Sequence, residues 1–140
     1  IYEIRKAVKF PFLSILEETA LALKSKKIKR VGILATETTI ESKIYEGVLK
    51  NNEIDILYPS KNEQNIINNV IVELLNETKN NLQKEKLESV CEALHKNGAE
   101  IILLACTDLQ LIASDIKVSV PIIDTTDILV NASVREMMKS

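Results

Sequence analysis

Apolar residues along the chain follow two patterns, short unbroken runs and stripes at helical spacing. A short apolar run is typical of a strand buried on both faces of a parallel sheet, and a stripe that recurs every three or four residues predicts an amphipathic helix. The runs predict strands at residues 31–35, 54–57, 101–104 and 120–123. The stripes predict helices at residues 2–8, 11–24, 40–49, 66–75, 87–94 and 125–138, with a further short helix after Cys106.

The order of these elements predicts the fold class. Strands alternate with helices through most of the chain, which is typical of an α/β fold in which a parallel sheet carries helices on both faces. A chain of 140 residues is long enough for one ordinary domain with a substantial core.

Three threonine or serine residues have the spacing of a helix capping box, with a glutamate or glutamine three positions later. The pairs are Thr38 with Glu41, Ser60 with Glu63, and Thr107 with Gln110. Each pair follows a predicted strand, so the free N–H groups of several helices should meet at one sheet edge and favour a carboxylate or phosphate ligand. Ser60 is expected to cap only, whereas the hydroxyls at Thr107 and in residues 36–39 are open to both capping and ligand binding. Gly98 is expected to end the helix before the third strand.

Cys106 is the main candidate for chemistry. The run Ile101-Ile102-Leu103-Leu104 ends in Ala105-Cys106-Thr107-Asp108, and ligands of open α/β sheets bind beyond the carboxyl ends of the strands. A thiol at a helix N-terminus is expected to have a lowered pKa. The alternative is that Cys106 only fills the junction between strand and helix, because free cysteine is often buried. Cys91 lies on an apolar helix stripe and is expected in the core.

Composition excludes several classes of function. The formal charge of −2 gives no reason to expect a nucleic-acid partner. No stretch reaches the roughly 20 apolar residues of a membrane span, so we expect no membrane partner and a cytoplasmic location. Two cysteines and one histidine make neither a disulfide framework nor a zinc site, so no structural metal is expected.

Several motifs together resemble the aspartate/glutamate racemase superfamily, and its aspartate racemase branch most of all. They are Val31-Gly32-Ile33-Leu34-Ala35-Thr36-Glu37-Thr38-Thr39-Ile40, then Tyr45, then Pro59 with Gln64, and then Gly98-Ala99-Glu100 leading into Cys106-Thr107-Asp108. The resemblance implies a cofactor-independent enzyme, without pyridoxal phosphate, in which two pseudo-symmetric α/β lobes enclose the active site. One cysteine from each lobe flanks the α-carbon of an acidic amino acid; one removes the proton and the other returns one.

The resemblance also assigns the two expected catalytic residues. Cys106 falls on the second-lobe cysteine of the pair. Asp108 stands where aspartate racemases usually carry glutamate, which favours that branch, and is expected to orient the thiol or tune its proton.

The expected substrate-binding residues are threonines. Thr107 falls on a threonine that helps to hold the substrate carboxylate, and Thr36 and Thr39 fall on the two hydroxyls of the family's turn after the first strand of this lobe. Thr38 replaces a frequent glycine of that turn and is counted with the same group of hydroxyls.

By the same resemblance, the chain divides into three parts. Residues 1–10 are expected to be a helix remnant of the first lobe, residues 11–120 the second α/β lobe, and residues 121–140 a last strand and helix that return toward the first lobe. The first catalytic cysteine would precede Ile1, so the 140-residue chain alone is expected to be inactive. Ile128, Leu129 and Ala132 are expected to expose apolar surface to the missing lobe. A homodimer is expected because family members are often dimers.

Two alternatives remain open. One is a decarboxylase or cis-trans isomerase of the same superfamily that acts on a small diacid, with the second-lobe cysteine on one side only. The other is a non-catalytic, flavodoxin-like binding domain, although the three glycines are too scattered for a phosphate-binding loop.

Overall fold

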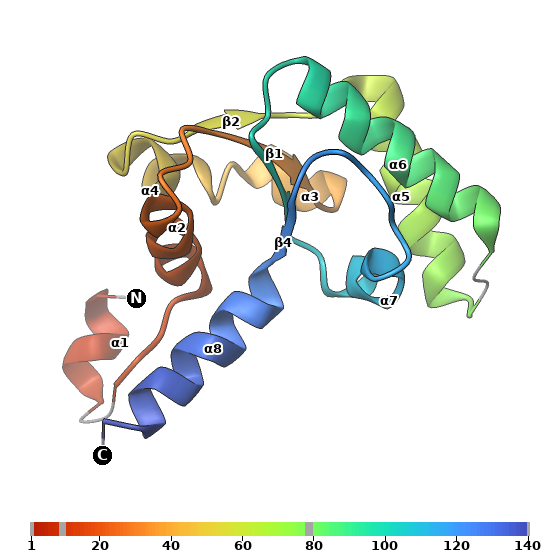
Figure 1. Cartoon of the computed structure of the whole chain (residues 1–140). Coiled ribbons are helices and arrows are strands. Elements are labelled where there is room, and N and C mark those ends of the chain that lie inside the picture. Colours follow the sequence, from red (N-terminus) through yellow and green to blue (C-terminus); the bar gives the residue numbers. More distant parts are fainter. Residues whose placement is uncertain (1, 9–10, 78–79, 140) are drawn as a thin grey trace.

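A computed structural model describes residues 2–8, 11–77 and 80–139 of the chain (Figure 1). Residues 1, 9 and 10 of the predicted first-lobe remnant therefore lie outside the described residues. The elements are α1 (Tyr2–Ala7), α2 (Ile15–Ser25), β1 (Arg30–Leu34), α3 (Glu37–Ser42), α4 (Glu46–Asn51), β2 (Asp55–Leu57), α5 (Lys61–Leu75), α6 (Asn81–Lys96), β3 (Ile101–Leu104), the 3-10 turn η1 (Thr107–Leu109), α7 (Gln110–Ala113), β4 (Ile122–Asp124) and α8 (Thr125–Met137).

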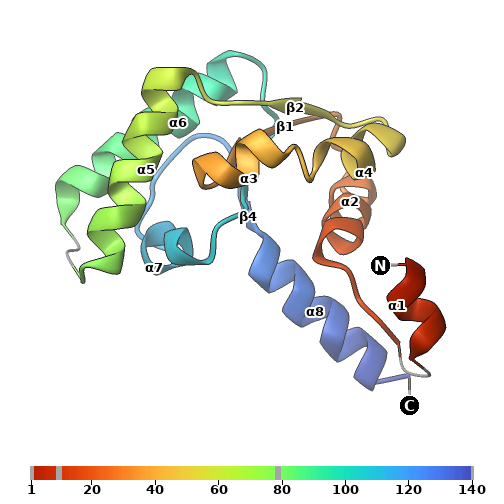
Figure 2. The same ribbon diagram turned by 180° about the vertical axis from the view of Figure 1, so that it is seen from behind.

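The four described strands form one parallel sheet in the order β2-β1-β3-β4. Figures 1 and 2 show α5, α6 and α7 on one side of this sheet, and α2, α4 and α8 on the other. The predicted α/β fold, a parallel sheet with helices on both faces, is therefore confirmed. All four residues of β3 are buried, as the unbroken apolar run indicates.

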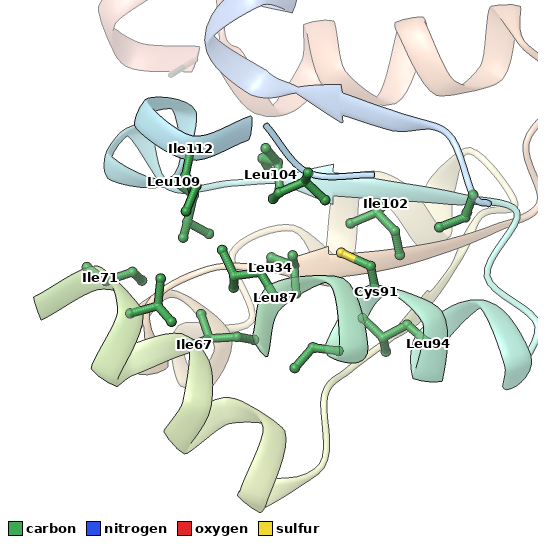
Figure 3. Close-up of a cluster of buried hydrophobic side chains, with 14 of the residues drawn as sticks. Leu34, Ile67, Ile71, Leu87, Cys91, Leu94, Ile102, Leu104, Leu109 and Ile112 are labelled. Atoms are coloured by element: carbon green, nitrogen blue, oxygen red, sulfur yellow. The ribbon is translucent and has the colours of Figure 1, made fainter. Parts of the chain in front are cut away.

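Two apolar cores lie on opposite faces of the sheet. The first packs the stripes of α5 and α6, with Leu109 and Ile112, against β1 and β3 (Figure 3). Cys91 is fully buried in this core, as predicted. The second core packs α2, Leu49 of α4 and Ile128 of α8 against the other face.

Several predicted boundaries are wrong, each for a local reason. The helix expected at residues 11–24 begins only at Ile15, because the extended backbone of Ser14 forms its N-cap. The helix expected at residues 40–49 is two short helices, since Lys43 has a left-handed φ of 52° that ends α3. Helix α6 ends at Lys96, and Gly98 follows with a φ of 107°, as predicted.

Only one of the three predicted capping boxes forms as expected. Ser60 and Glu63 make both bonds of a capping box at the start of α5. Thr38 is not an N-cap, because α3 begins one residue before it and Thr36 caps that helix instead. Thr107 lies inside the 3-10 turn η1, whose N-cap position is Cys106, and makes no capping box. A capping box that the sequence analysis missed joins Asn80 and Gln83 at the start of α6.

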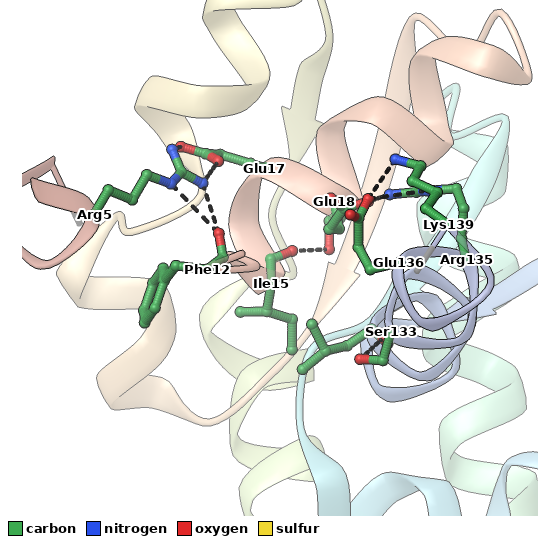
Figure 4. A network of polar contacts seen from close by, with 11 residues as sticks. Arg5, Phe12, Ile15, Glu17, Glu18, Ser133, Arg135, Glu136 and Lys139 are labelled. Carbon is green, nitrogen blue, oxygen red and sulfur yellow. Dashed lines mark hydrogen bonds and ion pairs between the residues drawn. The ribbon is translucent and has the colours of Figure 1, made fainter. Parts of the chain in front are cut away.

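The expected apolar exposure on the last helix is also wrong. Ile128 and Ala132 are buried and Leu129 is half-buried, because α8 packs along α2. At this contact Arg135 donates to Glu18 at 2.8 Å (Figure 4). The apolar side chains that α8 does expose are Val130, Val134 and Met137. Figure 4 also shows Arg5 of α1 reaching the Phe12 carbonyl and the Glu17 carboxylate, which ties α1 to the start of α2.

Candidate active site

Three neighbouring strands end side by side at one edge of the sheet. β1 leads into Ala35 and Thr36, β3 leads into Ala105 and Cys106, and β4 ends at Asp124. The Ala105 N–H donates to the Leu34 carbonyl at 2.8 Å, which extends the pairing of β1 and β3 beyond the strands. The sheet order therefore places Cys106 between the turn after β1 and the end of β4.

Thr36 and Thr39 form a pair of hydroxyls in the turn after β1. The Thr36 backbone is extended and caps α3, with its Oγ1 accepting a hydrogen bond from the Thr39 N–H at 3.3 Å. The two Oγ1 atoms lie 3.0 Å apart, and both residues are half-buried. Thr38 is exposed on α3 and Thr107 is exposed on η1. The structure thus brings Thr36 and Thr39 together, and leaves Thr38 and Thr107 at the surface.

Cys106 is half-buried and has an extended backbone, with φ −140° and ψ 124°. Its thiol donates a hydrogen bond to the Asp108 Oδ2, with 3.7 Å between Sγ and Oδ2. Because Cys106 packs against the first core, burial raises the pKa of its thiol above the usual value. Hydrogen bonds from the Asp108 and Leu109 amides lower this pKa, but the Asp108 charge raises it again.

The predicted lowered pKa of Cys106 is therefore wrong. A lowered pKa would need a helix dipole behind the thiol, but the structure has a 3-10 turn of three residues followed by the four-residue α7. Such short elements align few peptide dipoles, so burial dominates. Burial also raises the pKa of Cys91, in this case to about 12, which leaves that thiol unreactive.

Tyr45, Asp124 and Thr125 belong to the same edge and were missed by the sequence analysis as site residues. Tyr45 is 6% exposed, and burial raises the pKa of its hydroxyl. The nearby Asp124 charge also raises this pKa, whereas a hydrogen bond with Thr125 lowers it. Asp124 accepts from the Thr126 N–H at 2.6 Å through Oδ1, while its buried Oδ2 has no partner among the described residues. The sequence contains a pattern that could have identified Asp124 as a site residue, because Asp124 directly follows an apolar run, as the Cys106 segment does.

An open hollow of about 510 Å³ lies beside this edge. Its lining includes Thr39, Tyr45, Ala105 and Leu129, together with residues 12–16. A larger hollow of about 660 Å³ lies between α2, α8 and β4, and Asp124 is part of its lining. Neither hollow has Cys106 among its described lining residues, but the smaller one reaches Ala105, the residue directly before Cys106.

The side chains at this edge are of types that can transfer a proton and bind a carboxylate. A half-buried thiol can exchange a proton, and neighbouring hydroxyls can hold an anionic group. In residues 2–8, 11–77 and 80–139, no three His, Cys, Asp or Glu side chains are placed to bind a metal ion. None of the helices within those ranges is long and apolar enough to cross a membrane.

Comparisons with known proteins show which family this chain is similar to. The family model described as Asp/Glu/Hydantoin racemase matches residues 1–133. The broad specificity amino-acid racemase RacX of Bacillus subtilis is 32% identical over 134 residues, which are 94% of this chain and 57% of RacX.

Solved structures that are similar to this chain are also described as racemases. A putative Asp/Glu racemase from Yersinia pestis matches with a TM-score of 0.78 at 30% identity, over 89% of this chain and 55% of that one. The aspartate racemase of Picrophilus torridus matches with a TM-score of 0.66 at 30% identity, over 84% and 48% of the two chains. The chain thus spans about half the length of these relatives.

Proposed function

The chain belongs to the Asp/Glu/hydantoin racemase family, and we propose that it is the second lobe of a cofactor-independent racemase that acts on aspartate or a similar acidic amino acid. The observation that carries this proposal is the position of Cys106. Its half-buried thiol follows the central strand β3, beside the hydroxyl turn that follows β1.

Cys106 acts as one of two acid/base groups in the proposed reaction. A thiolate from the first lobe takes the α-proton and becomes a thiol. The Cys106 thiol then gives its proton to the opposite face of the carbanion and becomes a thiolate. Because burial raises the pKa of Cys106, its resting form is the thiol that this step requires. Asp108, whose Oδ2 accepts a hydrogen bond from the thiol at 3.7 Å, orients the Sγ.

The hydroxyl turn binds the substrate carboxylate in this proposal. Negative charge spreads from the α-carbon onto the carboxylate as the proton leaves, and preorganised donors stabilise that charge. Thr36 and Thr39 supply hydroxyls from the turn after β1, while the exposed Thr38 and Thr107 supply further donors at the rim. Closure by a first lobe excludes water from the site.

The proposed partner is therefore a first lobe of the same polypeptide. The extent of the relatives supports it, since RacX is nearly twice as long as the region that this chain covers. In this arrangement residues 1–10 end the first lobe, residues 11–120 form the second, and residues 121–140 return toward the first. A homodimer is part of the same proposal.

Removal of the thiol tests the proposed function. In a polypeptide that joins this chain to its first lobe, Cys106→Ser should lower kcat for aspartate racemisation by about 10²- to 10⁴-fold, since this is the usual contribution of a general acid or base. Cys91→Ala is the matched control, because it removes a thiol that is buried in the core. It should lower stability and leave kcat within about twofold, as the mutated side chain does not reach the site. Full activity of Cys106→Ser would refute the assignment.

One observation also favours a second candidate, a decarboxylase or cis-trans isomerase of the same superfamily. Both reactions can use a single protonated thiol, and burial keeps Cys106 protonated. Release of carbon dioxide from a small diacid, or isomerisation of its double bond, together with no racemisation of aspartate, would favour this candidate.

A further inference from the structure

Two side chains of α5, Gln64 and Asn68, hold the backbone on both sides of Thr36. The Gln64 Nε2 donates to the Ala35 carbonyl at 2.9 Å. Asn68 accepts from the Glu37 N–H at 3.3 Å through its Oδ1. The Gln64 Nε2 also donates to the same Asn68 Oδ1 at 2.9 Å, so the two amides are linked. We call this pair the α5 bracket.

The orientation of both amides in the bracket follows from their partners. Both groups that Gln64 contacts are acceptors, which requires the Nε2 to face them. The Asn68 Nδ2 donates to the Glu37 carboxylate at 3.3 Å, which leaves the Oδ1 for the other two bonds. The bracket is therefore a connected network rather than three separate contacts.

Packing alone does not explain Gln64. The residue is 7% exposed, and its buried Oε1 has no donor among the described residues. A buried polar atom without a partner costs about 1–3 kcal/mol. An apolar side chain of similar shape would avoid that cost. The contribution of Gln64 to the structure is therefore the two hydrogen bonds that its Nε2 donates.

The turn needs such an anchor because the apolar packing of α3 is slight, with Ile40 only half-buried against the second core. All six residues of α3 are described, and none of them is buried. By contrast α5 has 15 residues, a complete capping box at Ser60 and a buried apolar stripe. A rigid helix can fix a short one through directed hydrogen bonds, and binding groups lose effect when they are displaced by about 1 Å.

We propose that Gln64 is a positioning residue that fixes, through the α5 bracket, the Thr36 and Thr39 hydroxyls for the substrate carboxylate. This proposal rests on the proposed function, because it assumes that the hydroxyl turn binds the carboxylate. Gln64 acts through the backbone of Ala35 and Glu37 and does not touch the substrate.

The first test measures the turn itself by hydrogen exchange. The Thr39 N–H, which donates to the Thr36 Oγ1, should exchange at least about tenfold faster in Gln64→Met, because the turn opens more often. The matched control is Gln83→Met on α6, where a buried glutamine donates to Glu73 at 2.8 Å, remote from the turn. It should leave exchange at Thr39 unchanged. Equal exchange in wild type and Gln64→Met would overturn the proposal.

The second test is a double-mutant cycle in a polypeptide that joins this chain to its first lobe. With L-aspartate as the probe, Gln64→Met should lower kcat/KM by about 10- to 100-fold, mainly through KM, as expected when a binding group is misplaced. In a Thr36→Val background the same substitution should have less than about a twofold further effect. Gln83→Met should have little effect on kcat/KM in either background. If Gln64→Met lowered kcat/KM by the same factor in the Thr36→Val background as in wild type, the proposal would be overturned.

The two tests separate the possible failures. If wild type racemises neither aspartate nor another acidic amino acid, the proposed function fails, and hydrogen exchange at Thr39 alone decides whether the bracket fixes the turn. If wild type is active and exchange is unaffected by Gln64→Met, the bracket fails and the proposed function stands.

Discussion

Replacement of Gly32 by alanine should destabilise the fold through a clash that the structure locates. Gly32 lies in β1, and a Cβ added there would lie 2.8 Å from the Ile102 Cδ1 and 3.2 Å from both the Leu94 Cβ and Cδ1. Ile102 and Leu94 are buried, at 0% and 1% exposure, so neither side chain can turn outward into solvent. The Leu94 Cβ cannot rotate away, and α6 itself must therefore shift.

The magnitude follows from two opposing effects. Overpacking of a closely packed core costs about 1–3 kcal/mol. Glycine inside a strand is itself less favourable than alanine by about 0.5–1 kcal/mol, which offsets part of that cost. From the middle of both ranges, the net destabilisation expected for Gly32→Ala is about 1 kcal/mol. Urea unfolding should report it as a lower midpoint with an unchanged m-value.

Two companion variants make this reasoning refutable. Gly47→Ala, in α4, is the matched control, because its added Cβ would meet no described atom within 4 Å beyond its chain neighbours and the backbone of its own helix. It should stabilise the fold by about 0.4–1 kcal/mol. Ile102→Val removes the Cδ1 that would clash, so Gly32→Ala should cost less in that background, by about 0.5 kcal/mol or more. A Gly32→Ala variant as stable as wild type, or strict additivity with Ile102→Val, would contradict the argument.

Thiol reactivity and acid stability supply two more predictions. Iodoacetamide should modify Cys106 before Cys91 in the folded protein, because Cys91 is buried. The rate of Cys106 modification should still rise with pH near pH 9.0, because burial raises the pKa of the Cys106 thiol above that value. A modification rate that levels off below about pH 7 would contradict this. Hydrogen bonds from the Ser119 N–H and hydroxyl, at 2.6 and 2.8 Å, lower the pKa of Glu92 in the folded state. Its contribution to stability is present above the unfolded pKa of about 4.5 and is lost as the pH falls through the lower folded value. Urea midpoints should therefore depend less on pH in this acid range for Glu92→Gln than for wild type, and equal slopes would refute the inference.

Local patterns were sufficient to predict the sheet and the position of the thiol. The apolar run at residues 101–104 is β3 residue for residue, and Cys106 follows it at the edge where the strands end. The capping pair Ser60 and Glu63 also forms as expected. These features depend on residues that are close in sequence.

Features that depend on distant contacts could not be predicted in the same way. The apolar stripe continues across Lys43, so it gave no sign that the backbone turns left-handed there. The raised pKa of Cys106 depends on burial against the first core. The burial of Ile128 and Ala132 depends on α2, which lies more than 100 residues earlier in the sequence.

The central claim is that Cys106 moves a proton at the α-carbon of an acidic amino acid. The most direct measurement is racemisation of L-aspartate in deuterium oxide, with the deuterium at the α-carbon of the D-product followed over time, in a polypeptide that joins this chain to its first lobe. The account predicts that wild type and Cys91→Ala form D-aspartate that carries solvent deuterium, and that Cys106→Ser forms almost none. Deuterated D-aspartate formed by Cys106→Ser at the wild-type rate would contradict it.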